Sequence, residues 1–222
     1  MTHDPAPRAA SREDPGLAEL LGGRGGAVDA SVPVVGFVLA WVIAGYLGSA
    51  YPINWGAAAA IVSGAGVAVW RLARGRKPRA VLLGLAGVVA AAGIALLTGR
   101  ASDFFLVQIV SNVGSAVAWA ISIVVRWPLL GVIVGGLLGQ RTRWRRDPDL
   151  LRGYQRASWA WVGQYLVRLS VFLPLWAADQ VVLLGLARTV LSPALVGLSV
   201  LVSWPLLRTA LPDDHPGIRH PR

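Results

Sequence analysis

Long apolar runs alternate along the chain with short polar connections. Each of six runs contains no acidic residue and comes close to the roughly 20 residues that a helix needs to cross a bilayer. The runs predict six membrane-crossing helices, at about 32–50, 55–70, 80–97, 104–125, 158–178 and 189–207. Residues 1–20 and 209–222 are polar and contain proline, so we expect them to be disordered tails on either side of a helical domain at 21–208.

A seventh apolar run, 129–139, is too short to cross. Its 11 residues would extend about 16 Å as a helix, whereas the hydrocarbon layer is about 30 Å thick. We therefore expect a re-entrant or interfacial helix, and the sequence leaves these two alternatives open. Small residues at every fourth position, as in Gly36, Ala40, Ala44 and Gly48, predict close helix packing. The expected fold is an all-α polytopic membrane bundle.

Composition and charge agree with this prediction and set its orientation. Hydrophobic residues make up 55% of the chain and charged residues 14%, with a net charge of +10. Cytoplasmic loops carry the excess of Lys and Arg, so the basic connections predict that both termini are cytoplasmic in a bacterial inner membrane. We expect these residues to contact anionic lipid headgroups, and we expect no nucleic-acid partner. The candidate contacts are Arg71, Arg74, Arg76, Lys77, Arg79, Arg141, Arg143, Arg145 and Arg146.

Residues that could perform chemistry are scarce. The chain has no cysteine, its 11 acidic residues fall in tails or loops, and His3, His215 and His220 lie in the expected tails. We therefore expect no catalytic residue, metal or cofactor, and we interpret the chain as non-enzymatic.

Four polar side chains within the runs form a candidate intramembrane site: Arg168, Gln164, Asn112 and Gln108. A charge at mid-depth costs at least ~2.5 kcal/mol on insertion scales, which favours a functional role such as binding an anion or a lipid headgroup. Alternatively, Arg168 is structural and bonds backbone carbonyls, Asn112 or Gln164, which lies one turn away on the same face. Both interpretations stay open. We expect Arg188 to mark the outer interface, because Gly185 and Pro193 would let the last crossing begin near Thr189.

Several motifs resemble known families. Leu97-Thr98-Gly99-Arg100 with Asp103-Phe104-Phe105, Arg126-Trp127-Pro128-Leu129-Leu130-Gly131, and Ser158-Trp159-Ala160-Trp161 distantly resemble the bacterial intracellular septation protein A family. The stretch from about 20 to 208 resembles more closely an actinobacterial membrane family of unknown function, through residues 22–26, 144–148 and 166–169. These resemblances imply an inner-membrane protein of septation, envelope maintenance or lipid homeostasis.

The sequence leaves two functions open. The first is a non-enzymatic envelope protein that contacts membrane lipids, with homo-oligomerisation or envelope protein partners undecided. The second is a small transporter or channel for an anion or lipid, with Arg168 at a mid-membrane site.

Overall fold

The computed structural model describes residues 23–140, 142–212 and 215–218, with side chains from residue 29 onward. The described residues form α-helices and two short 3-10 helices, with no strand among them, as the apolar pattern predicted. The α-helices are α2 (Gly23–Tyr46), α3 (Pro52–Ala73), α4 (Pro78–Thr98), α5 (Leu106–Val124), α6 (Leu129–Leu137), α7 (Pro148–Ala177) and α8 (Val181–Arg208). The 3-10 helices are η1 (Ala101–Phe105) and η2 (Arg143–Arg145).

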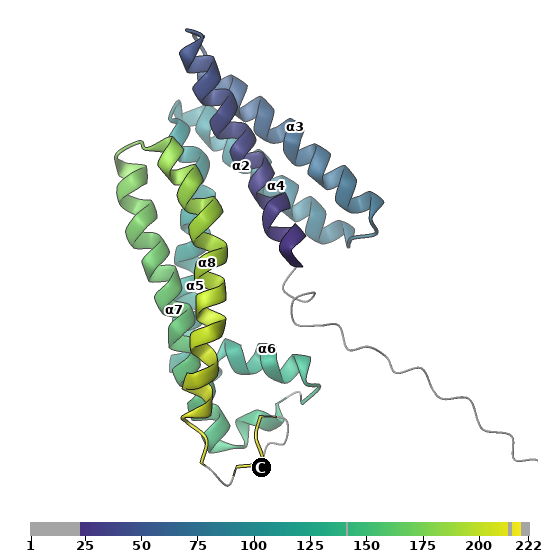
Figure 1. Ribbon diagram of the computed structural model, residues 1–222, viewed down its shortest axis with the longest axis vertical. Coiled ribbons are helices and arrows are strands. Elements are labelled where there is room, and N and C mark those ends of the chain that lie inside the picture. The colour runs from purple at the N-terminus through teal and green to yellow at the C-terminus, as the bar shows by residue number, and fades with distance from the viewer. Residues whose placement is uncertain (1–22, 141, 213–214, 219–222) are drawn as a thin grey trace, which may run out of the picture.

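The long helices form two groups of three (Figure 1). Helix α3 packs between α2 and α4, and α7 packs between α5 and α8. The two groups meet near η1 and diverge toward the opposite end, where the short α6 extends sideways from the second group (Figure 1). Consecutive long helices are antiparallel, so the α3–α4 turn, the start of α7 and the end of α8 all lie at the lower ends of their helices in this view.

An aromatic core joins the two groups at the η1 end. The ring of Phe37 on α2 stacks on Phe104 at 4.1 Å between centroids, and Phe104 meets Phe105 edge to face at 5.5 Å. All three side chains are buried. Close approach of α8 to α2 depends on Gly185, where an added Cβ would lie 2.9 Å from a methyl group of Val38. Aromatic packing and small residues therefore hold this junction together.

A second core lies at the other end of the α5–α7–α8 group. Trp119 stacks on Trp161 at 5.0 Å, and Trp144 of η2 meets Tyr154 edge to face at 5.5 Å. Gly131 of α6 packs against the Trp144 ring, and a Cβ added at Gly131 would lie 2.7 Å from a carbon of that ring. The short run at 129–139 therefore does not cross the bundle; it forms a nine-residue helix that packs against the start of α7.

Among the described residues, five helices are long and apolar enough to cross a membrane by length and composition: Asp29–Tyr46, Pro52–Ala73, Pro78–Thr98, Ala101–Val124 and Val181–Arg208. Four of them contain or closely match the predicted runs between 32 and 125. The last differs from its prediction, because α8 begins at Val181 and continues through Pro193 instead of starting near Thr189. A proline removes one backbone donor, yet here the helix continues on both sides of it.

The described part of the segment after residue 208 also differs from the expected disordered tail. His215 and Ile218 pack against the start of α7 and the end of α6, and the side chain of His215 is fully buried. The expectation that His215 lies outside packed structure was therefore wrong. Residues 1–20, with the predicted N-terminal tail and His3, lie outside the described residues, as does His220.

Candidate functional site

Arg168 lies on α7 at the interface with α8, and its side chain is buried. One terminal nitrogen donates to the side-chain oxygen of Gln164 at 3.1 Å and to the backbone carbonyl of Ser192 at 2.9 Å. Its guanidinium also lies 5.4 Å from the ring centroid of Tyr165. These contacts agree with the structural alternative for Arg168, because the amide of Gln164 and a carbonyl of α8 accept hydrogen bonds from one terminal nitrogen, although the buried Nε has no partner among the described residues.

The other two predicted polar residues pair with each other. Gln108 donates to the side-chain oxygen of Asn112 at 3.2 Å, one turn further along α5. Asn112 is buried, and its amide nitrogen has no hydrogen-bond partner among the residues that the structure describes. The four predicted residues thus form two separate hydrogen-bonded pairs, one along α5 and one along α7.

Arg188 lies beside a cavity that the sequence did not predict. It lies two turns into α8, half-buried, and lines a cavity of about 180 Å³ between the two helix groups. Most of the other lining is apolar or glycine, with Gln108 and Ser111 contributing polar side chains; the lining residues are Val34, Leu83, Gly84, Gly87, Val88, Ala91, Phe104, Val107, Gln108, Ser111 and Arg188. Arg188 therefore lines a cavity, and its position at the outer interface stays a prediction.

The first basic connection, between α3 and α4, is mostly exposed. Arg71 forms an ion pair with Asp29 of α2 at 3.0 Å, and the guanidinium of Arg74 lies 4.3 Å from the ring centroid of Trp70. Arg76, Lys77 and Arg79 are exposed. Such side chains can contact anionic headgroups at low conformational cost, because they already lie in the solvated region at the helix ends.

The second basic connection precedes α7. Arg143, Arg145 and Arg146 are exposed, and the guanidinium of Arg145 lies 3.8 Å from the ring centroid of Trp127. Arg141 lies outside the described residues. An arginine stacked on a tryptophan is typical of a membrane interface, where the ring is partly apolar and the charge stays hydrated.

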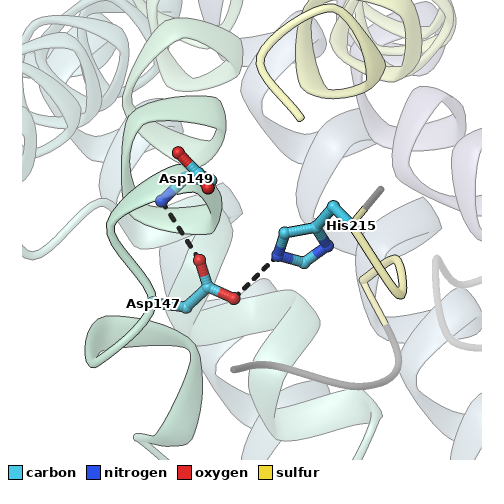
Figure 2. A group of neighbouring side chains, drawn as sticks. All are labelled: Asp147, Asp149 and His215. Atoms are coloured by element: carbon cyan, nitrogen blue, oxygen red, sulfur yellow. Dashed lines mark hydrogen bonds and ion pairs between the residues drawn. The ribbon is translucent and has the colours of Figure 1, made fainter. Parts of the chain in front are cut away.

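The start of α7 is joined to the segment after α8 by a buried polar clamp (Figure 2). Asp147 caps α7: one carboxylate oxygen accepts from the backbone N–H groups of Asp149 at 3.1 Å and of Leu150 at 3.2 Å. The other oxygen lies 2.8 Å from Nε2 of His215. Nδ1 of the same ring accepts the backbone N–H of Gly217 at 2.9 Å, so the ring proton is on Nε2 and is donated to Asp147.

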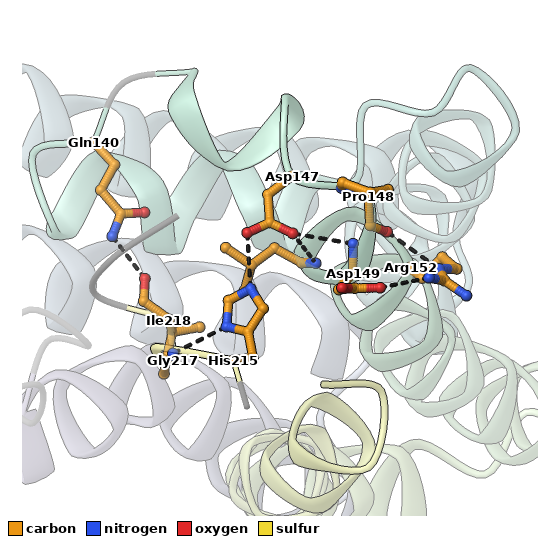
Figure 3. A network of polar contacts seen from close by, with 9 residues as sticks. Gln140, Asp147, Pro148, Asp149, Arg152, His215, Gly217 and Ile218 are labelled. Carbon is orange, nitrogen blue, oxygen red and sulfur yellow. Dashed lines mark hydrogen bonds and ion pairs between the residues drawn. The ribbon is translucent and has the colours of Figure 1, made fainter. Parts of the chain in front are cut away.

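Further polar contacts extend the clamp on both sides (Figure 3). The amide of Gln140 donates to the carbonyl of Ile218 at 2.7 Å, and Asp149 pairs with Arg152. Tyr154 lies buried nearby; burial, with a smaller contribution from the charge of Asp147, raises its pKa to about 12.

Asp147, Asp149 and His215 are also the kinds of side chain that can ligate a metal, and one potential ligand atom from each lies within 4.8 Å of the others. In this arrangement, however, one Asp147 oxygen accepts hydrogen bonds from helix N–H groups and the other contacts His215. An Asp149 oxygen accepts a hydrogen bond from Arg152. The geometry is therefore that of a structural clamp.

The fold and its apolar helices define an all-helical protein with several potential membrane spans. The chain belongs to the family described as protein of unknown function (DUF3159), which matches residues 21–214. This membership confirms the predicted resemblance to a family of unknown function, whereas the likeness to septation protein A and the actinobacterial origin stay predictions. No curated protein and no solved structure matches the chain.

Proposed function

We propose that this chain is a non-enzymatic, multi-pass protein of the bacterial cytoplasmic membrane whose basic end binds anionic lipid headgroups on the cytoplasmic side. The supporting observation is the segregation of charge along the helices. The connections at 71–79 and 143–146 lie at the same ends of antiparallel helices, and their basic side chains are largely exposed. The turns at the other ends contain Arg100 as their only basic residue.

Six crossings, with both termini cytoplasmic, follow if α7 crosses together with the five apolar helices. Helix α7 has 30 residues, or about 45 Å, and it packs antiparallel to α8 after a short turn. Because α8 meets the criteria for a span, a partner helix packed along it passes through the same depth. The packing of Arg168 against Gln164 and α8 supports this placement, since its charge then faces protein and not lipid.

We place its biological role in envelope maintenance, septation or lipid homeostasis, from the sequence resemblance and the lipid-facing basic end. The alternative with Arg168 as a transport site has less support, because the Arg168 side chain is buried and bonded to two protein groups.

Single cysteines in this cysteine-free chain test the orientation. In intact cells, an impermeant thiol reagent should label Gln180→Cys, which is exposed in the α7–α8 turn, and should label Arg145→Cys only after permeabilisation. Labelling of Arg145→Cys in intact cells would contradict the proposed topology.

Lipid binding is tested on the purified chain in nanodiscs of mixed phosphatidylglycerol and phosphatidylcholine. We expect the fraction of phosphatidylglycerol retained by the wild-type chain to fall in the triple variant Arg76→Gln/Lys77→Gln/Arg79→Gln. The matched control is Arg100→Gln, which removes a charge from the opposite end. Equal retention by the triple variant and the wild type would refute headgroup binding by this loop.

A further inference from the structure

Arg188 differs from the other arginines that lie within the helices. Arg168 bonds Gln164 and Ser192, and Arg71 pairs with Asp29, whereas Arg188 makes no hydrogen bond or ion pair with any residue that the structure describes. It lies well inside a helix that is apolar enough to span a membrane. A charge in such surroundings is costly unless an opposite charge or several acceptors accompany it.

The cavity beside Arg188 offers room for such a partner. It lies where the two helix groups begin to diverge, with walls from α2, α4, η1, α5 and α8. Gly84 and Gly87 of α4 create part of the space: a Cβ added at either would meet no atom within 4 Å. Gln108 and Ser111 add hydrogen-bonding groups from α5, while the remaining lining is almost entirely hydrocarbon.

We propose that this cavity binds the anionic headgroup of a single amphiphile, a carboxylate or phosphate ester carrying an acyl chain. The guanidinium of Arg188 offers charge-assisted hydrogen bonds to an oxyanion, and Gln108 and Ser111 supply further polar contacts. The apolar walls suit the first part of the acyl chain. The rest of the acyl chain extends between the diverging helix groups, because the cavity volume of about 180 Å³ is smaller than the 300–1,000 Å³ of sites that enclose a whole ligand.

A free inorganic anion fits this lining less well. A hydrated anion entering the cavity would lose its water against mostly apolar walls and regain one cationic partner. An amphiphile, by contrast, gains apolar contact along its chain as its headgroup reaches Arg188. This site is distinct from the exposed basic end and does not depend on it.

Photo-crosslinking of the full chain in phosphatidylcholine nanodiscs tests the site. Three diazirine-labelled probes are used: a long-chain fatty acid, a phosphatidylglycerol, and an uncharged alcohol of the same chain length. We expect at least one anionic probe to label peptides of α4, α5 or α8 next to the cavity more than the alcohol does. A difference in labelling between the fatty acid and the phosphatidylglycerol shows whether the site prefers a carboxylate or a phosphodiester. Equal labelling by the alcohol, or full competition by acetate or inorganic phosphate, would overturn the proposal.

Two variants locate the site. Arg188→Gln removes the charge and should lower the specific labelling about tenfold or more, since hydrogen bonds to charged groups are among the stronger ones. Gly87→Leu fills the cavity and should have a similar effect. Their matched controls are Arg208→Gln, at the exposed end of α8, and Gly93→Leu, on α4 outside the cavity lining.

Size-exclusion and thermal unfolding profiles establish which variants fold. If Arg188→Gln does not fold, Gly87→Leu and the charge-retaining Arg188→Lys decide. Wild-type labelling in a folded Gly87→Leu variant would place the ligand elsewhere and refute the proposal. Variants of the basic loop at 76–79 should leave cavity labelling unchanged, so this test and the headgroup test can fail separately.

Discussion

The contact between Asp147 and His215 predicts that a single amide substitution releases the segment after α8. In Asp147→Asn, one side-chain oxygen can still cap α7, but the amide N–H₂ then faces the Nε2–H of His215. Turning the amide round places its N–H₂ against the N–H groups of Asp149 and Leu150 instead. Moving the ring proton to Nδ1 sets it against the N–H of Gly217. No arrangement of this amide and imidazole satisfies all these donors.

The magnitude follows from burial and charge. Both side chains are almost completely buried, at 0% and 1% exposure, so solvent does not screen their interaction. A buried hydrogen bond to a charged group contributes about 1.5–3 kcal/mol. If losing this hydrogen bond lets the segment after α8 detach locally, the fraction of molecules with the segment detached rises by roughly 10- to 150-fold. The conversion is about 1.4 kcal/mol per factor of ten.

Limited proteolysis measures this opening. Trypsin cleaves after Arg208 in the exposed last turn of α8, and cleavage there should track the open population when reclosing is fast. We expect cleavage of Asp147→Asn and of His215→Ala to accelerate within that range, with the double variant no faster than the faster single one. The control is Asp179→Asn, an exposed aspartate in the turn at the far end of α7. Unchanged cleavage in both single variants would refute the clamp.

Three further predictions concern individual side chains. Tyr154→Phe removes a buried hydroxyl that has no partner, so the free energy of unfolding near neutral pH should stay the same or rise by up to about 1 kcal/mol. Because burial raises the pKa of Tyr154 to about 12, the folded chain keeps a phenol proton that the unfolded chain loses above pH 10. The free energy of unfolding of the wild type should therefore fall by about 2–3 kcal/mol between pH 10 and 12. The Phe variant should lack this loss. Gly131→Ala would place a Cβ 2.7 Å from the ring of Trp144 and should cost about 1–3 kcal/mol in thermal unfolding, whereas Gly136→Ala, with open space around it, should not destabilise α6. Arg168→Cys should stay unlabelled by an impermeant thiol reagent even in permeabilised cells; rapid labelling would show that this depth of the bundle is wet.

Local patterns in the sequence predicted much of this fold. The length of each apolar run indicated which segments are long helices, and the shortness of 129–139 indicated that α6 is short. That α6 does not cross the membrane stays a prediction. The spacing of Gln164 and Arg168 predicted their hydrogen bond, because residues four apart share a helix face. Each of these features depends on residues close together in the chain.

The features that the sequence did not predict depend on contacts between distant segments. His215 pairs with a residue 68 positions earlier, and no spacing rule connects a histidine after one helix to the N-cap of another. Pro193 suggested a break near the start of the last crossing, whereas α8 continues through it from Val181 to Arg208.

The clamp also bears on the order in which the protein assembles during synthesis. Contacts among α2, α3 and α4 join segments that are neighbours in the chain, so this group can form as it emerges. The contact between Asp147 at the start of α7 and its buried partner His215 forms later, because His215 is synthesised only after all of α8. His215 lies 68 positions after Asp147, so at about 5–20 residues per second its synthesis follows about 3–14 s later. During that interval the carboxylate of Asp147 caps its helix without the imidazole, which makes the nascent α7–α8 pair the latest part of the described structure to close.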